Sequence, residues 1–224
     1  MNDINHPPLT QALTSTPAQA WKNWLAVVVL GISSFSIVTT ELAPIGLLSP
    51  LANEFRLSTG TAGLIVTAYA WIAAIAALLS ATLLSRVPRK SLLIALMTVL
   101  ALSSFIAAEA TAFSTLLIAR MAGALAHGAF WAMIGTVGAQ LVPPARIGLA
   151  TSIIFGGVSA ASVAGVPLAN LLAQSAGWRT AFIAVSVLSL IAAGALMLTL
   201  PRLPTSTSPG WRALADLLRN RAFL

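Results

Sequence analysis

Six long apolar stretches are the feature that most limits what this chain can become. Each has 18 or more residues and no more than two ionisable side chains, which is enough for a helix to cross the hydrocarbon core of a bilayer. Membrane β-barrels show alternating segments of about ten residues instead of solid apolar blocks. The sequence therefore predicts an all-α membrane protein with a six-helix transmembrane bundle over residues 22–200. The stretches are residues 24–48, 61–84, 91–108, 112–142, 147–176 and 180–200.

The polar composition removes most soluble and enzymatic functions. Charged residues make up 8% of the 224, against about 25% in soluble domains. The absence of cysteine excludes disulfides and thiolate metal sites, and two histidines with five acids leave little for a hydrolytic or metal centre. We therefore expect no enzyme activity, no metal and no cofactor. The net charge is +7, and the basic residues that produce it lie between the apolar stretches. This placement indicates membrane topology rather than nucleic acid binding.

The basic residues also predict the orientation in the membrane. With the N-terminus inside, nine of the twelve Lys and Arg lie on the cytoplasmic side, and the outer side receives Arg56 and Arg179. Both termini are then cytoplasmic, and residues 1–21 form a polar cytoplasmic tail. The nine are Lys22, Arg86, Arg89, Lys90, Arg146, Arg202, Arg212, Arg219 and Arg221.

A weak internal repeat divides the six stretches into two groups of three. Residues 90–95 align with residues 179–184 at an offset of 89, and the first and fourth stretches begin 88 residues apart. Two consecutive three-helix units have opposite orientation because three is odd, so the pattern predicts a 3+3 inverted repeat. The alternative is a chance similarity between two apolar helix starts.

Glu41 and Arg120 are charges inside the predicted helices. Counting 1.5 Å per residue from the outer ends of the first and fourth helices places both roughly 10–12 Å deep, so we expect them to meet. Charges at this depth usually face a bundle interior or aqueous cavity, and they mark either a transport pathway or a buried ion pair that fixes packing.

Three further residues are candidates for the same pathway. His127 lies two turns deeper than Arg120 on nearly the same face, where it can carry a proton, bind a substrate hydroxyl or donate to a neighbouring backbone. Trp131 follows one turn later. Tyr69 adds an aromatic surface that suits stacking on a sugar or a drug, although single aromatic residues in membrane helices more often serve packing.

Small residues at a spacing of four form two ridges on the fifth helix, and such ridges let helix backbones approach closely. Tight packing is the plainer interpretation, and a hinge during conformational change is the functional one. Pro167 is expected to kink this helix near its outer end. The first ridge is Ser152, Gly156, Ala160 and Ala164, and the second is Gly157, Ala161, Gly165 and Ala169.

Several segments, read in order, resemble the drug and sugar efflux branch of the major facilitator superfamily. Residues 39–48 look like the first-helix motif of that branch, and residues 120–131 are similar to helix 4 of bacterial sugar efflux transporters. Residues 165–168 and 177–182 resemble helix 5 and the turn into helix 6 of the same group. The resemblance runs from about Trp24 to the C-terminus and covers one half of a twelve-helix family.

The resemblance implies a function and a set of partners. It implies proton-coupled efflux of sugars or related small molecules across the bacterial inner membrane, with helices 1 and 4 lining the cavity. Residues 201–224 then correspond to a cytoplasmic linker towards a second bundle, and a second half or a homodimer is the expected partner. A multidrug exporter and a non-transporting truncated half remain the alternatives.

The loop between helices 2 and 3 departs from the family pattern. It retains the basic residues Arg86, Arg89 and Lys90, which the resemblance identifies as a gate loop. Three other positions differ, and we expect the charge network of the inward gate to be weaker here. These are Ala81 and Pro88, which replace glycines, and Ser85, which replaces an aspartate.

Overall fold

The computed structural model describes residues 17–203, and all six apolar stretches form helices long and apolar enough to cross a membrane. We number these helical units as spans 1 to 6. Their limits are Gln19–Glu54, Thr59–Ser80, Arg89–Ala108, Phe113–Gln140, Pro144–Ala176 and Trp178–Thr199. The predicted tail at 1–16 and the greater part of the predicted linker, 204–224, lie outside the described residues.

Several spans consist of more than one helical segment. Span 1 contains α1 (Pro17–Leu42), the 3₁₀ segment η1 (Ala43–Leu47) and α2 (Leu48–Glu54). Span 2 contains α3 (Thr59–Ala62) and α4 (Leu64–Leu83), while α5 (Arg89–Ala108), α6 (Phe113–Gln140) and α9 (Trp178–Thr199) are single helices. Span 5 contains η2 (Pro144–Arg146), α7 (Ile147–Ala160), the π-helical segment η3 (Ala161–Gly165) and α8 (Val166–Ala176).

The first helix, α1, begins at Pro17, inside the segment 1–21 that the sequence predicts as a cytoplasmic tail. Proline is favoured as the first residue of a helix because its missing N–H would have no intrahelical partner there. The polar residues that follow Pro17 therefore belong to the helix.

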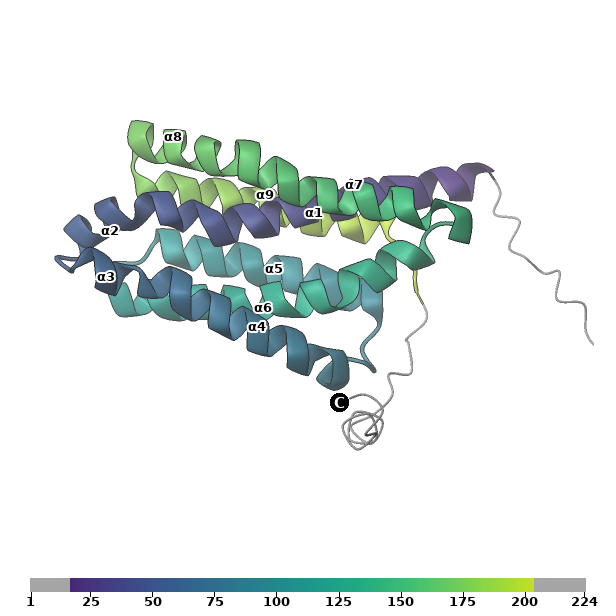
Figure 1. Cartoon of the computed structure of the whole chain (residues 1–224), viewed down its shortest axis with the longest axis horizontal. Helices are drawn as coiled ribbons and strands as arrows, with labels where there is room; N and C mark the ends of the chain where they lie inside the picture. Colours follow the sequence, from purple (N-terminus) through teal and green to yellow (C-terminus); the bar gives the residue numbers. More distant parts are fainter. Residues whose placement is uncertain (1–16, 204–224) are drawn as a thin grey trace, which may run out of the picture.

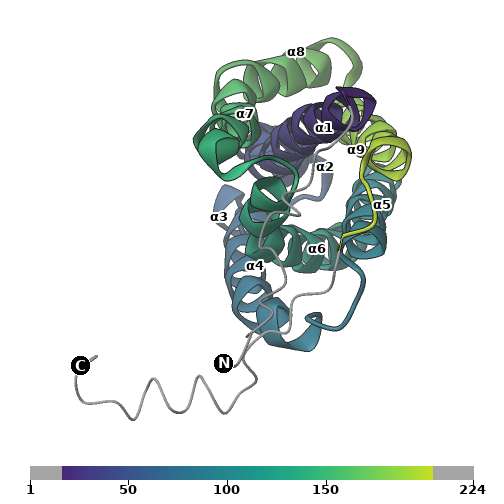
Figure 2. The same cartoon turned by 90° about the vertical axis from the view of Figure 1, so that its right-hand side faces the viewer.

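The neighbours of each helix follow the symmetry of the predicted inverted repeat. Span 1 packs on spans 5 and 6, and span 4 packs on spans 2 and 3, while spans 3 and 6 pack on each other. Exchanging span 1 with 4, 2 with 5 and 3 with 6 reproduces this set of pairs, whereas the contact between α8 of span 5 and α9 of span 6 has no counterpart of similar size between spans 2 and 3. Seen along the bundle, α4 and α7 lie on one side and α5 and α9 on the other (Figure 2). This arrangement is that of a 3+3 inverted repeat.

Most basic residues of the described part lie at one end of the bundle. The starts of α1, α5 and α7 and the end of α9 lie together, and α2, α3 and the end of α8 lie at the opposite end (Figure 1). Arg89 opens α5 and Arg146 ends η2, whereas Arg56 follows α2 and Arg179 is the second residue of α9. The segregation expected from the sequence is therefore present in the fold.

The second small-residue ridge of span 5 packs against α1, and the first does not. A Cβ on Gly157 would meet the carbonyl of Gly31, and one on Gly165 would meet Thr39. Gly156 has nothing within 4 Å of its Cβ position, and its ridge is exposed. Only the ridge that contains Gly157 and Gly165 thus fixes a close approach between span 1 and span 5.

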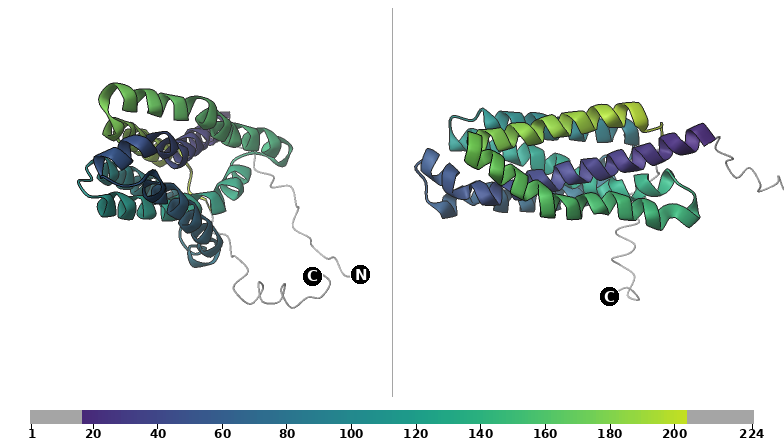
Figure 3. Two further views of the ribbon diagram at one scale, coloured as in Figure 1. Left: turned by 60° about the vertical axis from the view of Figure 1, so that its left-hand side comes forward. Right: turned by 90° about the horizontal axis from the view of Figure 1, so that it is seen from above.

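Proline accompanies two interruptions of regular α-helix at the outer halves of spans 1 and 5. Pro44 lies in η1, which joins α1 to α2. Pro167 lies at the start of α8, and the π-helical turn η3 precedes it. The irregularity at Ala161–Gly165 therefore begins six residues before Pro167, because proline disturbs the turn before it. Figure 3 shows α8 continuing from α7 along the far half of the bundle.

Candidate functional site

Glu41 lies at the last turn of α1, immediately before the 3₁₀ segment, and faces α6. Its carboxylate Oε2 is 3.6 Å from Nε2 of His127. The His127 side chain is 7% exposed and the Glu41 side chain 31% exposed, so the acid keeps contact with its surroundings while the imidazole is enclosed. This pair joins span 1 to span 4 through two titratable groups.

Tyr69 of α4 completes the surroundings of the imidazole. Its hydroxyl lies 3.2 Å from Nδ1 of His127, and the two rings meet edge to face with centroids 5.4 Å apart. In the tautomer that carries its proton on Nε2, His127 accepts from Tyr69 and directs an N–H towards Glu41. Tyr69 is 1% exposed because neighbouring side chains cover its ring, which is the packing role that single aromatic residues in membrane helices more often serve.

Arg120 lies in the same cluster as Glu41, as their equal depth allowed, but the two side chains do not form a direct ion pair. Within residues 17–203 the ion pair of Glu41 is with His127, and Arg120 donates instead from Nη1 to the backbone carbonyl of Thr40, at 2.9 Å. Its guanidinium carbon lies 4.1 Å from the centroid of the Tyr69 ring. Equal depth brought the two residues to the same region, but their side chains have different partners.

The carbonyl that Arg120 binds is left free by a proline. In a regular α-helix the N–H of residue 44 would donate to the carbonyl of residue 40, and Pro44 has no N–H. A buried carbonyl without a donor costs free energy, more so where no water can reach it. The guanidinium of Arg120 supplies the missing donor and so caps the end of α1 beside Glu41.

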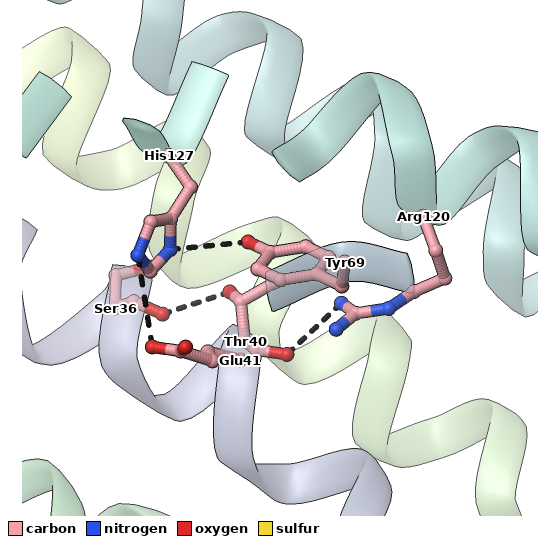
Figure 4. Close-up of polar contacts among 6 residues, drawn as sticks. All are labelled: Ser36, Thr40, Glu41, Tyr69, Arg120 and His127. Atoms are coloured by element: carbon pink, nitrogen blue, oxygen red, sulfur yellow. Dashed lines mark hydrogen bonds and ion pairs between the residues drawn. The ribbon is translucent and has the colours of Figure 1, made fainter. Parts of the chain in front are cut away.

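These contacts close into a ring that returns to its starting point. From Glu41 the ring passes to His127, then to Tyr69, to Arg120 and to the carbonyl of Thr40, which is the chain neighbour of Glu41 (Figure 4). Spans 1, 2 and 4 each contribute to it. A change in the charge of one member therefore alters the contacts of residues on three spans.

Ser36, which lies on α1 five residues before Glu41, connects span 1 to span 6. The Thr40 hydroxyl donates to the Ser36 carbonyl at 2.8 Å, and the Ser36 hydroxyl lies 2.7 Å from that of Ser189. The bond between the two serine hydroxyls is of the kind that holds membrane helices together, whereas the Thr40 bond stays within α1.

An aromatic row continues from the ring towards span 5. The centroids of His127 and Trp131 are 6.3 Å apart, and those of Trp131 and Phe155 are 5.6 Å apart. Trp131 is half-buried, as a pathway residue would be, and Phe155 of α7 is 46% exposed. Sequence analysis missed Phe155 because a lone phenylalanine on an uncharged helix carries no signal of its own.

The three basic residues of the predicted gate loop differ in their exposure. Arg86 is exposed, Lys90 is half-buried, and Arg89 is 7% exposed at the first position of α5. The three side chains therefore do not form one solvated basic patch.

A second polar connection at the opposite end of the bundle was not foreseen. Arg179 donates to Glu54 at 3.0 Å and to the carbonyl of Ala110 at 3.1 Å, and its guanidinium lies 4.2 Å from the ring of Trp178. These contacts join the ends of spans 1, 3 and 6. Since Arg179 and Glu54 are well exposed, the pair ties the rim together but contributes little stability.

Comparison with known families identifies the family and the fold of the chain. The model of the Major Facilitator Superfamily matches residues 12–224. This chain belongs to the major facilitator superfamily. With its six candidate spans it is therefore a multi-pass membrane protein.

The chain is also similar to a solved transporter structure, a bacterial homolog of the human lysosomal transporter Spinster in an inward-facing and unoccupied conformation. The TM-score is 0.65 at 16% sequence identity, over 92% of this chain and 50% of that chain. At this identity the likeness establishes the fold alone. The chain spans half the length of the transporter it matches.

Proposed function

We propose that this chain is one six-helix half of a proton-coupled exporter of small organic molecules, with Glu41 as the proton carrier. The observation that carries the proposal is the pairing of Glu41 with His127 at the junction of spans 1, 2 and 4. A carboxylate that is half enclosed within the membrane is costly unless it has a partner or a function. Protonation of Glu41 removes its charge and weakens its attraction to His127 and Arg120.

The proposed substrate is a sugar or a related small molecule, as the resemblance of the helix 4 segment suggests. Trp131 offers a ring for the apolar face of a sugar, and Glu41 offers acceptors for its hydroxyl groups. Export of apolar drugs is the second candidate. The exposed ring of Phe155 beside Trp131 favours it equally, because aryl groups stack on the same surface.

The proposed partner is a second six-helix bundle. Spans 2 and 5 are the least buried of the six. In the most apolar 18 residues of each span, 28% are buried in span 2 and 17% in span 5, against 61% in span 4. Both lie on the side of the bundle occupied by α4 and α7 (Figure 2). A second half or a second copy would cover these spans and enclose Glu41. The proposed location is the bacterial inner membrane, with the basic end of the bundle in the cytoplasm.

A flux experiment with this bundle reconstituted together with its proposed second bundle tests the proposal. Proteoliposomes with an acidic lumen receive either a labelled disaccharide or a labelled lipophilic cation outside. We expect accumulation of one substrate in the wild type, and loss of gradient-driven accumulation in Glu41→Gln. Substrate exchange without a gradient should persist in that variant, because exchange requires no net proton transfer.

Glu109→Gln is the matched control, since Glu109 is an exposed acid at the end of α5. It should accumulate substrate as the wild type does. Accumulation of the disaccharide supports sugar export, and accumulation of the cation supports drug export. Gradient-driven accumulation that persists in Glu41→Gln would show that Glu41 is not the proton carrier.

A further inference from the structure

A groove runs along the face of α1 that points away from the polar ring. Ile32 precedes Glu41 by nine residues, which is two and a half helical turns, so the two side chains lie on opposite sides of α1. Around Ile32 the groove has a volume of about 310 Å³ and an apolar lining from α1 and α7. The lining includes Val28, Ile32, Phe35, Ile153, Gly156 and Ala160.

Span 5 narrows this groove towards the end of the bundle that carries fewer basic residues. There α8 packs on α9, whereas α7 packs on α1 and has no comparable packing on α9 within the described residues. In the nearer half, α7 and α9 lie on either side of α1 (Figures 2 and 3). A smaller hollow of about 170 Å³ continues between α1, α8 and α9, and Phe35 lines both parts. The groove is therefore wider at the basic end and narrower beyond Phe35.

Each of the three helices that border the groove has an exposed basic residue at the same end of the bundle. Lys22 lies near the start of α1, Arg146 directly precedes α7, and Arg202 follows α9. The three acids of residues 17–203 lie elsewhere, in the last turn of α1, at the end of α2 and after α5. The mouth of the groove therefore has an excess of positive charge.

The length of the groove matches one leaflet of a bilayer. Lys22 and Phe35 are thirteen residues apart, which is about 20 Å along α1. Half of a bilayer with its headgroups measures roughly 20–22 Å. Trp21 is exposed at the mouth, seven and eleven residues before Val28 and Ile32 and so on the same face, and indole rings favour the membrane interface. An apolar groove of this length below a group of positive charges has the form of a phospholipid with a negative headgroup.

We propose that this groove binds one acyl chain of an anionic phospholipid, whose headgroup contacts Lys22, Arg146 and Arg202. A helix with its side chains is about 10–12 Å wide, and the packing of α8 on α9 leaves no such width beyond Phe35. An acyl chain is narrow enough to continue into the smaller hollow. The site goes beyond the proposed transport function and does not depend on it, because it lies on the side of α1 opposite Glu41.

Native mass spectrometry of the full 224-residue chain in detergent, titrated with dioleoyl phosphatidylglycerol, tests the groove. Gly156→Leu places a side chain where nothing lies within 4 Å, and it should weaken binding of this lipid roughly two- to tenfold. The variant should still fold, because leucine favours a helix more than glycine does. Gly135→Leu is the matched control, since Gly135 of α6 also has nothing within 4 Å and does not line the groove. It should bind the lipid as the wild type does.

A second pair of variants tests the headgroup. Arg146→Gln should weaken binding of dioleoyl phosphatidylglycerol about fivefold and leave the weaker binding of dioleoyl phosphatidylcholine unchanged, because only the first lipid carries a net negative charge. Arg86→Gln removes an exposed charge at the same end of the bundle, in the loop between α4 and α5 and away from the groove. It should not change the affinity for either lipid.

Three results would overturn the proposal. Equal affinity of Gly156→Leu and the wild type for dioleoyl phosphatidylglycerol would show that no chain lies in the groove. Equal affinity of the wild type for the two lipids would show that the basic residues hold no headgroup. A wild-type dimer that Gly156→Leu dissociates would show that a second copy occupies the groove instead. None of these measurements involves flux, so the lipid site and the transport function can fail separately.

Discussion

At the scale of single residues, Arg120 shows how a buried cation is accommodated without a carboxylate in contact. Its Nη1 binds a backbone carbonyl, and its flat guanidinium lies over the Tyr69 ring. Both contacts use the planar shape of the group as well as its charge. A lysine ammonium is a compact point charge that cannot lie flat on a ring and cap a carbonyl in the same way.

Arg120→Lys should therefore destabilise the protein although it conserves charge. We expect a loss of about 1–3 kcal/mol, which is the range for one hydrogen bond to a charged group and one desolvated cation–π contact. Thermal unfolding in detergent measures it. Arg56→Lys is the control, because Arg56 is exposed at the end of the bundle. Equal unfolding temperatures for Arg120→Lys and the wild type would show that charge alone matters at this position.

The sequence could predict the depth of the site residues but not their partners. Counting residues along apolar helices placed Glu41 and Arg120 at one level, and they do lie in one polar ring. Depth could not decide whether the two side chains pair directly, because it says nothing of the direction in which a helix presents a side chain. The partner of Arg120 is the backbone carbonyl of Thr40. The sequence indicates this carbonyl only indirectly, through Pro44 four residues later.

At the scale of helical elements, the end of α1 depends on a donor from another span. If Pro44 frees the Thr40 carbonyl and Arg120 caps it, the two residues should be energetically coupled. Pro44→Ala restores an N–H that can donate to that carbonyl, so Arg120→Met should cost about 1 kcal/mol less in the Pro44→Ala background than in the wild type. Unfolding free energies of the four proteins give this difference.

Pro50→Ala provides the control for that cycle, since Pro50 lies exposed in α2 of the same span. It should not change the cost of Arg120→Met. Additive effects of Pro44→Ala and Arg120→Met would mean that α1 ends for a reason other than the missing N–H.

The adjacent glycines of span 5 give a second prediction at this scale. Gly157→Ala places a methyl group against the Gly31 carbonyl and the Phe35 N–H of α1, and it should destabilise the bundle by about 1–3 kcal/mol. Gly156→Ala meets nothing and should be neutral or stabilising by up to about 1 kcal/mol, because alanine favours a helix. Unfolding of the two variants side by side compares them, and equal effects would contradict the close approach of α1 and α7.

The spans were predictable from sequence because hydropathy over about 20 residues is a strong signal in a membrane protein. The short segments η1, α2 and α3 and the π turn η3 were not, because hydropathy over 20 residues does not resolve interruptions of a few residues, although Pro44 and Pro167 mark two of them. The two small-residue ridges looked equivalent in the sequence. Only the second ridge packs on α1, because Gly31 of α1 lies opposite Gly157.

At the scale of the whole molecule, the basic end of the bundle should face the cytoplasm. Reporter fusions after Arg56 and Arg179 should give an external signal, and fusions after Arg89 and Arg146 a cytoplasmic one. The fold already places the first two residues at one end and the last two at the other. A cytoplasmic signal at Arg56 together with an external one at Arg89 would reverse the orientation.

The distribution of buried surface bears on what one bundle can do alone. Span 5 is the least buried of the six, and span 2 follows it. The Glu41 side chain is 31% exposed, and His127 connects it to Trp131, which contacts Phe155 of span 5. In a lone bundle this face meets lipid, where an uncompensated carboxylate is costly. Alternating access in this superfamily moves two bundles about a site at their interface, so one bundle lacks half of that site.

Residues 1–224 expressed by themselves should therefore export nothing. Two copies could pair through spans 2 and 5, but their shared cavity would then hold two copies each of Glu41 and Arg120, and we expect the repeated charges to disfavour a working dimer. The measurement is retention of a labelled sugar and of a labelled lipophilic cation by cells that express the chain, compared with cells carrying an empty vector. Export above that background, lost again in Glu41→Gln, would establish a functional homodimer and replace the half-transporter interpretation.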